Sequence, residues 1–274
     1  MIQLEPQAAA WLSGHGLAAS AARRLGSART GALFAVDGHV LRWYGGSNFL
    51  EQEPDAIARE VAALSALEET TVPAPRLVAW SLDPPALLTT MRPGRNEFDA
   101  RDTGAILAVL DAIHATDGSG LASWSYRGYH EGRDLPRPAW WQDEAVWALA
   151  VSWSKVGPTA DEPVLIHRDF QPGNLLWSAG AISGVVDWGN ACRGPAAFDL
   201  AHYRVNLATL FDPDLADERL PGDPTWDIEA ALGFLDPWDP QARDAWAGPW
   251  PHASAEEARS RVEAFVARAV ARLR

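Results

Sequence analysis

Hydrophobic and polar positions in the first third of the chain follow a pattern typical of β-strands. Residues 31–44, GALFAVDGHVLRWY, contain two β-favouring runs on either side of Asp37-Gly38, a dipeptide that tolerates the positive φ of a tight hairpin turn. This segment therefore predicts an antiparallel β unit. Residues 73–80 and 86–91 predict two further strands, and the sequence RPGR at 92–95 predicts a turn or linker after them.

Other segments have the spacing of amphipathic helices. Within residues 54–69, apolar side chains recur every three to four positions, at Ile57, Val61, Leu64 and Leu67. A short helix is expected over residues 6–13, and the sequence SAEE at 254–257 is a capping box that opens a helix ending in arginines. Beyond residue 95 the pattern favours a mainly helical structure.

Composition adds the general class of protein. The chain has 274 residues, of which 47% are hydrophobic and 22% charged, as in a globular protein with a sizeable core. No apolar run approaches the roughly 20 residues of a membrane-spanning helix, and the N-terminal residues lack the pattern of an export signal. The single cysteine, Cys192, fits a reducing compartment, so we expect a cytoplasmic location.

Charge narrows the choice of partners. The net charge of −13 argues against nucleic acid or an anionic membrane and favours a cationic ligand. Residues 1–92 hold nine acidic and seven basic residues, whereas residues 93–274 hold 27 and 16. Residues 211–252 alone carry ten acidic residues, two arginines and several tryptophans. Acidic pairs in the second part could bind amino groups, although charge runs are usually solvated surface; these pairs are Asp161/Glu162, Asp212/Asp214, Asp217/Glu218 and Asp236/Asp239.

The most informative segment is residues 164–177, VLIHRDFQPGNLLW, in which an apolar strand enters a polar loop and an apolar strand leaves it. The sequence His167-Arg168-Asp169 with Asn174 five residues after the aspartate fits the pattern H-R-D-x4-N, and Asp187-Trp188-Gly189 stands in the place of D-F-G. Phosphoryl transfer requires a carboxylate beside the attacking hydroxyl and hard oxygen ligands for Mg²⁺ near the phosphates. A hairpin of two short strands would bring these groups to one end.

These motifs resemble the aminoglycoside phosphotransferase and choline kinase-like family of small-molecule kinases. The resemblance extends to Gly194-Pro195 and to Asp199-Leu-Ala201, which follow the second aspartate as they do in that family. It implies an α+β, bilobal protein-kinase-like fold, with a small N-lobe at residues 1–92 containing an antiparallel sheet and a larger, mainly helical C-lobe at residues 93–274. It also implies ATP and Mg²⁺ as cofactors, with the nucleotide between the lobes.

The same resemblance assigns roles in the catalytic loop. Asp169 would be the catalytic base or the carboxylate that orients the acceptor hydroxyl, and Asn174 and Asp187 would bind magnesium. Asp199 would brace the loop from the start of the next helix. His167 is expected to pack and form hydrogen bonds rather than transfer protons.

The nucleotide contacts are assigned by position. Ser27 lies in a small-residue segment, 26–31, that could cover the phosphates. Arg42 stands where the kinase-like fold usually has a lysine, and its expected partner is Glu60, which could equally be a solvated charge. Thr90 and Arg92 fall at the strand-to-linker hinge, whose backbone would pair with adenine.

The sequence thus predicts an ATP- and Mg²⁺-dependent kinase that phosphorylates a hydroxyl of a small, cationic acceptor such as an aminoglycoside-type antibiotic. Two alternatives remain: a kinase of a neutral or weakly charged metabolite, such as a sugar or amino alcohol, and a nucleotide-binding pseudokinase, which Arg42 suggests. The tryptophans at 140 and 147 are expected in the core rather than in a pocket. Cys192 and His202 are assigned no role, and the oligomeric state is left open.

Overall fold

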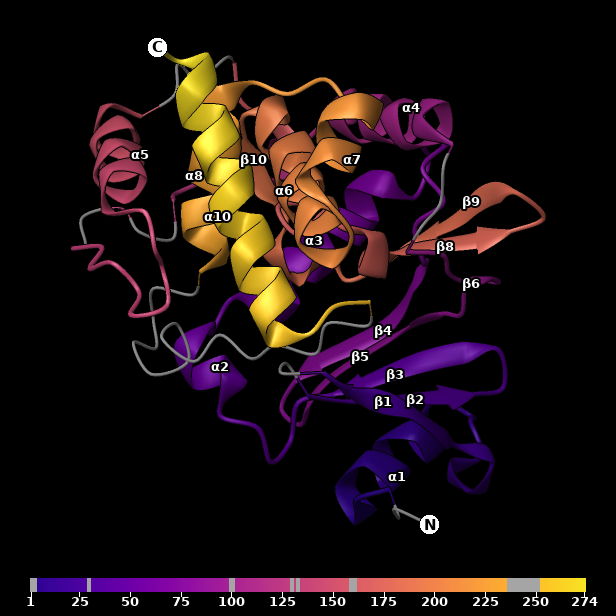
Figure 1. The fold of residues 1–274 in the computed structure, drawn as a ribbon. Helices are drawn as coiled ribbons and strands as arrows, with labels where there is room; N and C mark the ends of the chain where they lie inside the picture. The colour runs from indigo at the N-terminus through magenta and orange to yellow at the C-terminus, as the bar shows by residue number, and fades with distance from the viewer. Residues whose placement is uncertain are drawn as a thin grey trace.

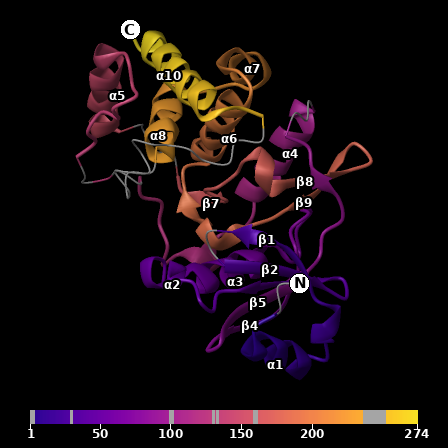
Figure 2. The ribbon, with the colours of Figure 1, turned by 60° about the horizontal axis from the view of Figure 1, so that its bottom comes forward.

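The chain folds into two lobes joined by a short linker (Figure 1). The computed structural model describes residues 4–28, 31–98, 102–128, 131, 134–157, 162–235 and 252–274. One lobe is built around a five-stranded antiparallel sheet, and the other is mainly helical. Figure 2, which turns the molecule by 60°, shows the same separation, with the sheet on one side and most of the helices of the second lobe on the other.

The N-lobe sheet has the strand order β1-β2-β3-β5-β4. Its strands are β1 (Arg23–Ala28), β2 (Gly31–Val36), β3 (His39–Trp43), β4 (Leu77–Leu82) and β5 (Pro85–Thr90). The predicted hairpin is confirmed, because Asp37 and Gly38 link β2 to β3 with φ values of 44° and 77°. Both central residues of this turn have the positive φ that a two-residue hairpin favours.

Part of the small-residue segment 26–31 lies in the sheet. Residues 26–28 belong to β1, which pairs with β2 from Arg23 opposite Ala35 to Ala28 opposite Gly31. The pairing register of β1 with β2 shifts between Arg24 and Gly26, as at a β-bulge. Residues 26–28 are small and show no alternation of hydrophobic and polar positions, so the sequence did not predict a strand here. Backbone pairing with β2 holds these residues in the sheet.

Helices cover both faces of the N-lobe sheet. On one face, α1 (Pro6–Gly14) packs Ala8 and Leu12 against a cluster that includes Leu41 and Leu88. On the other face, α3 (Ala56–Leu67) packs Ile57 against a smaller cluster that includes Leu87. Neighbouring residues of a strand point to opposite faces, so burial of both Leu87 and Leu88 follows from this double cover. The short helix α2 (Phe49–Gln52) precedes α3.

The linker leads into the C-lobe, whose strands are all short. They are β6 (Arg95–Asn96), β7 (Val164–Ile166), β8 (Leu175–Ser178), β9 (Ala181–Val185) and β10 (Cys192–Gly194). β8 pairs with β6 and β9, and β7 pairs with β10. The helices are α4 (Thr103–His114), α5 (Glu144–Val156), α6 (Ala196–Leu210), α7 (Pro213–Arg219), α8 (Pro224–Phe234) and α10 (Ala255–Arg272). No helix among the described residues is long and apolar enough to cross a membrane.

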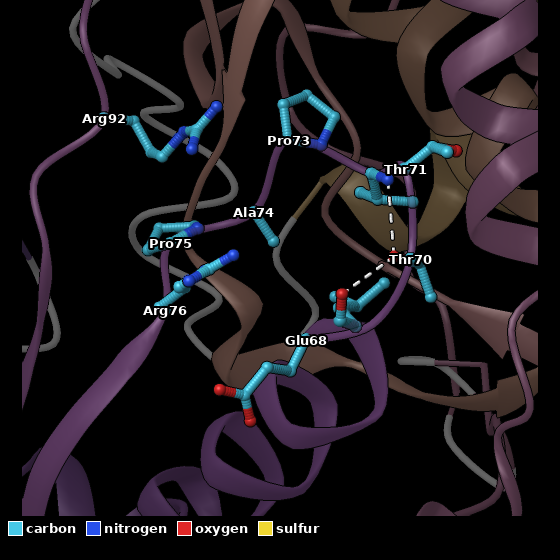
Figure 3. A pocket seen from close by; sticks show the side chains of 10 residues that line it. Glu68, Thr70, Thr71, Pro73, Ala74, Pro75, Arg76 and Arg92 are labelled. Carbon is cyan, nitrogen blue, oxygen red and sulfur yellow. Dashed lines mark hydrogen bonds between the residues drawn. The ribbon is translucent and has the colours of Figure 1, made fainter.

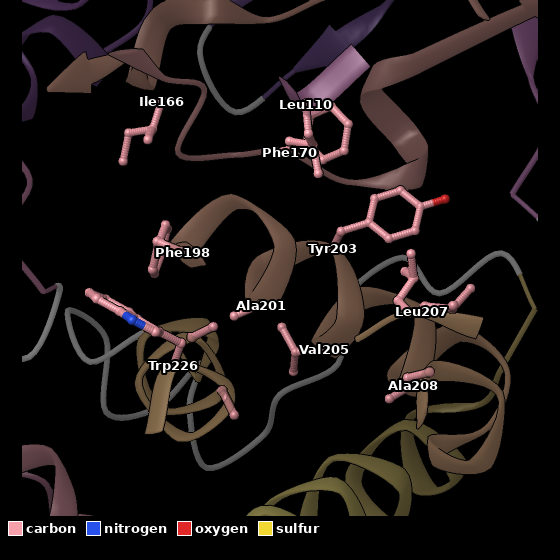
Figure 4. Packing of buried hydrophobic residues seen from close by; sticks show 14 of the residues in the cluster. Leu110, Ile166, Phe170, Phe198, Ala201, Tyr203, Val205, Leu207, Ala208 and Trp226 are labelled. Atoms are coloured by element: carbon pink, nitrogen blue, oxygen red, sulfur yellow. The ribbon is translucent and has the colours of Figure 1, made fainter. Parts of the chain in front are cut away.

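Helix α6 is the centre of the C-lobe. Nearly all its residues are buried, because α7, α8, α10, β7 and the loop of residues 167–174, expected to be the catalytic loop, surround it. Figure 4 shows its Phe198 beside Trp226 of α8 and its Tyr203 beside Phe170 of the catalytic loop. A helix that is buried all round fixes the positions of its polar residues as well. Two of these, Asp199 and His202, lie next to the catalytic loop.

The ends of other elements follow their sequence signals. The capping box at Ser254 and Glu257 is present in both directions, with Ser254 N–H donating to Glu257 Oε2 at 2.7 Å. Trp147 is 6% exposed in the C-lobe core, and Trp140 packs against that core, so the expectation for both tryptophans is confirmed.

Candidate active site

The loop between β7 and β8 is held by a buried carboxylate. Asp199, in the first turn of α6, is fully buried. Its Oδ2 accepts from the backbone N–H of His167 at 2.9 Å, and its Oδ1 accepts from that of Arg168 at 2.7 Å. Arg168 has a φ of 66°, a conformation that costs energy for a residue with a side chain. The two hydrogen bonds from Asp199 stabilise this turn of the backbone, and His114 Nε2 lies 3.1 Å from the same carboxylate.

His167 is a buried anchor of the same loop. Its Nδ1 accepts from the backbone N–H of Asp169 at 3.3 Å, and this contact places the proton on Nε2. Nε2 lies 3.0 Å from the carbonyl oxygen of Val186, the residue before Asp187. The ring also packs against Trp188, with centroids 4.4 Å apart. His167 therefore joins the segment of Asp169 to the segment of Asp187.

Three side chains donate hydrogen bonds to the Asp169 carboxylate. Gln171 Nε2 donates to Oδ1 at 2.8 Å, and His202 Nε2 lies 3.1 Å from the same oxygen. Asn174 Nδ2 donates to Oδ2 at 3.1 Å and to the Asp169 carbonyl at 2.8 Å. Burial raises the pKa of the Asp169 carboxyl, but the hydrogen bond and charge of His202, with contributions from His167 and Gln171, leave that pKa below its ordinary value. Asp169 is thus held as a carboxylate.

Asn174 and Asp187 lie on neighbouring segments. The carbonyl oxygen of Asn174 accepts from Val186 N–H at 3.0 Å, which brings the residue before Asp187 against the 3₁₀ turn Pro172–Asn174. Asp187 itself follows β9 and has the left-handed conformation, with a φ of 69°, at the start of the 3₁₀ turn Trp188–Asn190. The hairpin therefore gathers Asp169, Asn174 and Asp187 at one end.

The donor set fits magnesium. Asn174 uses its amide nitrogen on Asp169, which leaves its amide oxygen as the acceptor, and Asp187 Oδ2 has no protein partner among the described residues. No group of three or more His, Cys, Asp or Glu side chains in those residues could hold a metal ion. Mg²⁺ in proteins is usually held by one or two protein oxygen ligands, and phosphates and water complete its coordination shell.

Arg42 of β3 joins the N-lobe to this end of the hairpin. Its Nη1 donates to Asp187 Oδ1 at 2.7 Å, and its Nη2 lies 3.8 Å from Glu60 Oε1 on α3. Tyr44 Oη donates to Glu60 Oε2 at 3.4 Å, and burial raises the pKa of the Glu60 carboxyl. Glu60 is 4% exposed, so the alternative of a solvated charge is wrong. Arg59, also on α3, donates from Nε to the carbonyl of Gly189 at 2.9 Å.

The other predicted nucleotide contacts lie outside this cluster of hydrogen bonds. The backbone of Ser27 is in β1, opposite Ala32. Thr90 donates its N–H to the carbonyl of Arg76 at 2.9 Å and accepts from Arg76 N–H on its hydroxyl, so both groups are engaged within the N-lobe. The Arg92 guanidinium donates from Nε to the carbonyl of Ser183 on β9 at 2.8 Å.

Arg92 also lines a cavity of about 240 Å³ formed with residues 67–68 and 70–76. Figure 3 shows Arg76 and Arg92 on either side of Pro75, with Glu68 and Thr70 on the helix side. None of the catalytic-loop residues lines this cavity. The cavity, with the Arg92 side chain at its edge, is therefore separate from the hydrogen-bonded cluster around Asp169.

The acidic segment that suggested a cationic ligand is largely engaged in the fold. Asp214 pairs with Arg268, while Asp217 and Asp227 both pair with Arg204. Asp212 and Asp223 accept hydrogen bonds at the N-termini of α7 and α8. These five side chains make contacts that stabilise the C-lobe, and Asp227 is buried, whereas Asp212, Asp214, Asp217 and Asp223 are also exposed at its surface. Asp161, Asp236 and Asp239 lie outside the described residues.

Sequence reasoning missed the residue that donates to Asp169 from α6. His202 is 8% exposed and follows Asp199 by three positions. Residues three apart on a helix share one face. Because Asp199 was expected to contact the loop of residues 167–174, His202 could have been expected to face the same loop. Gln171 was missed as well, and its position two residues after Asp169 offered no periodicity to reveal it.

Comparison with known proteins identifies the family. The chain matches the phosphotransferase enzyme family over residues 37–265. The chain belongs to this family. A homoserine kinase from Beijerinckia indica subsp. indica is 28% identical over 166 residues, which are 55% of this chain and 47% of that enzyme. The chain thus aligns with about half the length of that relative.

Solved structures of other proteins share the fold. A ternary complex of aminoglycoside phosphotransferase APH(4)-Ia with AMP-PNP and hygromycin B has a TM-score of 0.60 and 19% identity, covering 97% of this chain and 99% of that one. LicA in complex with AMP has a TM-score of 0.61 and 13% identity, covering 95% and 97%. The predicted α+β, protein-kinase-like fold and the resemblance to a phosphotransferase family are confirmed.

Proposed function

We propose that this phosphotransferase moves the γ-phosphoryl group of Mg²⁺-bound ATP to a hydroxyl group of a small molecule that also carries an amino group. The observation that supports this most is the convergence of Asp169, Asn174 and Asp187, with Arg42 reaching the same end from the N-lobe. A carboxylate beside two magnesium ligands is the arrangement that phosphoryl transfer requires.

Asp169 would act on the acceptor. Its carboxylate is held ionised and can accept a hydrogen bond from the hydroxyl, which turns an oxygen lone pair toward the γ-phosphorus. As the new oxygen–phosphorus bond forms, the bond to the β-phosphate oxygen breaks and ADP leaves. The hydroxyl proton passes to Asp169. Because a carboxylate of low pKa is a weak base, we assign Asp169 mainly to orientation, with proton transfer late in the reaction.

Asn174 and Asp187 would hold magnesium, which when bound neutralises charge on the phosphates. Asp199 and His167 would keep the loop in the required shape through the hydrogen bonds described above. Ser27, Thr90 and Arg92 remain candidate nucleotide contacts by position. For Thr90, the contact would have to use a group other than its N–H and hydroxyl.

The amine on the acceptor is supported by charge and by the relatives. The net charge of −13 favours a cation over an anion, even though several acidic side chains are engaged in the fold. The homoserine kinase relative is named for an amino acid with a hydroxyl group, and the APH(4)-Ia complex holds an aminoglycoside. Both compounds combine hydroxyl and amino groups, so the acceptor class we propose includes both.

The test is nucleotide-dependent turnover. Purified protein with Mg²⁺ and ATP or GTP would be assayed for diphosphate release against aminoglycosides, homoserine, other amino alcohols and sugars. We expect acceptor-dependent release with an amine-bearing compound. Release with a neutral sugar alone would contradict the acceptor class, and nucleotide binding without release for any compound would favour the pseudokinase alternative.

Arg42 provides a second prediction for this function. Replacing Arg42 with Gln removes a charged donor that we assign to the nucleotide phosphates, so the KM for nucleotide is expected to rise by about 10- to 100-fold, the equivalent of one charge-assisted hydrogen bond. Arg42→Lys keeps the charge but not the two nitrogens that reach Asp187 and Glu60, so its KM is expected to lie between those of the wild type and Arg42→Gln. Arg76→Gln, an exposed arginine of the same lobe, is the matched control. An unchanged KM in Arg42→Gln would contradict the assignment.

A further inference from the structure

His202 approaches the Asp169 carboxylate from α6, a different element from the catalytic loop. Its Nε2 lies 3.1 Å from Asp169 Oδ1. An ionised carboxylate can only accept hydrogen bonds, so Nε2 must carry the proton in this contact. Gln171 donates to the same oxygen from within the loop, and Asn174 donates to the other oxygen. Both carboxylate oxygens are therefore contacted, but Oδ1 has two donors and Oδ2 has one.

The imidazole of His202 has little freedom to move. It is 8% exposed and stacks on the Phe198 ring, with centroids 5.8 Å apart and an angle of 30° between the rings. Phe198 is itself buried beside Trp226, as Figure 4 shows. The backbone carbonyl of His202 accepts from Asn206 Nδ2 within the same helix. The donor at Nε2 is therefore fixed by the core of the C-lobe.

We propose that His202 is a positioning residue for phosphoryl transfer: by fixing Oδ1 of Asp169, it directs Oδ2 toward the acceptor hydroxyl. This inference rests on the proposed function of Asp169. Asp169 lies on a loop, and the hydrogen bond from Gln171 joins two residues of that same loop. Only His202, among these donors, ties the carboxylate to a helix that is buried on all sides. A displacement of about 1 Å in a reacting group can reduce a rate by about 100-fold.

The geometry predicts a split between kcat and KM. His202→Leu removes the donor and is expected to lower kcat by about 10- to 100-fold, with the KM values for nucleotide and acceptor within about threefold of the wild type. His202→Gln places an amide N–H near the position of Nε2 and should recover most of kcat. His202→Asn has the same amide on a shorter side chain, which cannot reach Oδ1 as well, and should recover little. His15→Leu, at an exposed histidine after α1, controls for the substitution.

The comparison of Gln with Asn keeps the test decisive if His202→Leu fails to fold. Both variants are polar and of similar bulk, so a role in packing alone would give them similar kcat values. A higher kcat in His202→Gln than in His202→Asn, at equal unfolding midpoints, supports the inference. Equal kcat values in the two variants, or a wild-type kcat in His202→Leu, would overturn it. A wild type that turns over none of the acceptors would instead overturn the proposed function, and this inference with it.

Discussion

An Asp169→Asn protein is expected to turn over about 10²- to 10⁴-fold more slowly than the wild type and to bind nucleotide with unchanged affinity. The substitution keeps the shape of the side chain, and its amide oxygen can still accept from His202 and Gln171. It removes the negative charge that would align the acceptor hydroxyl and take its proton. Diphosphate release under saturating substrates gives the rate, and calorimetry gives the dissociation constant for nucleotide.

Asp83→Asn is the matched control for this variant, because Asp83 is exposed in the turn between β4 and β5. It should show wild-type turnover. If Asp169→Asn kept more than about one tenth of the wild-type rate, the loss of rate would be smaller than the loss usually seen when a group that takes part in proton transfer is removed. That result would contradict the role proposed for Asp169. Loss of nucleotide binding together with turnover would point instead to a damaged fold, which the unfolding midpoint would reveal.

The convergence of Asp169, Asn174 and Asp187 at one end of the hairpin could be predicted because these residues lie close together in the sequence. Asp169 and Asn174 are separated by five positions, and Asp187 follows two residues after the end of β9, the second strand of the hairpin. A short hairpin leaves few ways to arrange such groups, so motif and geometry agree. The same holds for the turn at Asp37-Gly38, where the residue types favour a tight turn with positive φ.

Contacts between elements distant in the sequence could not be predicted in the same way. The hydrogen bond between His202 and Asp169 depends on how α6 packs against the catalytic loop, and no local pattern encodes that orientation. The acidic residues from 212 to 227 are a second example. Their excess in the sequence suggested a surface for cations, but their partners Arg204 and Arg268 lie on helices before and after them. Net charge over a segment does not show which charges the fold neutralises internally.

Arg204→Leu is expected to lower the free energy of unfolding by about 3–5 kcal/mol, the cost of leaving a buried charge without its partner. Arg204 is fully buried on α6. Its Nε donates to Asp227 Oδ1 at 2.9 Å and its Nη2 to Asp217 Oδ1 at 2.6 Å. Its Nη1 donates to the carbonyl of Ala216 at 2.7 Å and also contacts that of Leu220. One guanidinium thus satisfies acceptors from α7, α8 and the turn between them.

The size of this effect depends on burial, and the chain provides a matched comparison. Arg268 pairs with Asp214 at the surface, with 37% of the arginine side chain exposed, so Arg268→Leu should cost at most about 1 kcal/mol. Urea unfolding of the two variants beside the wild type measures both losses. Arg272 also donates to Asp227, at 2.5 Å, and would retain part of the compensation in Arg204→Leu. Equal losses in the two variants would mean that water or Arg272 replaces Arg204, and the C-lobe would not depend on this buried arginine.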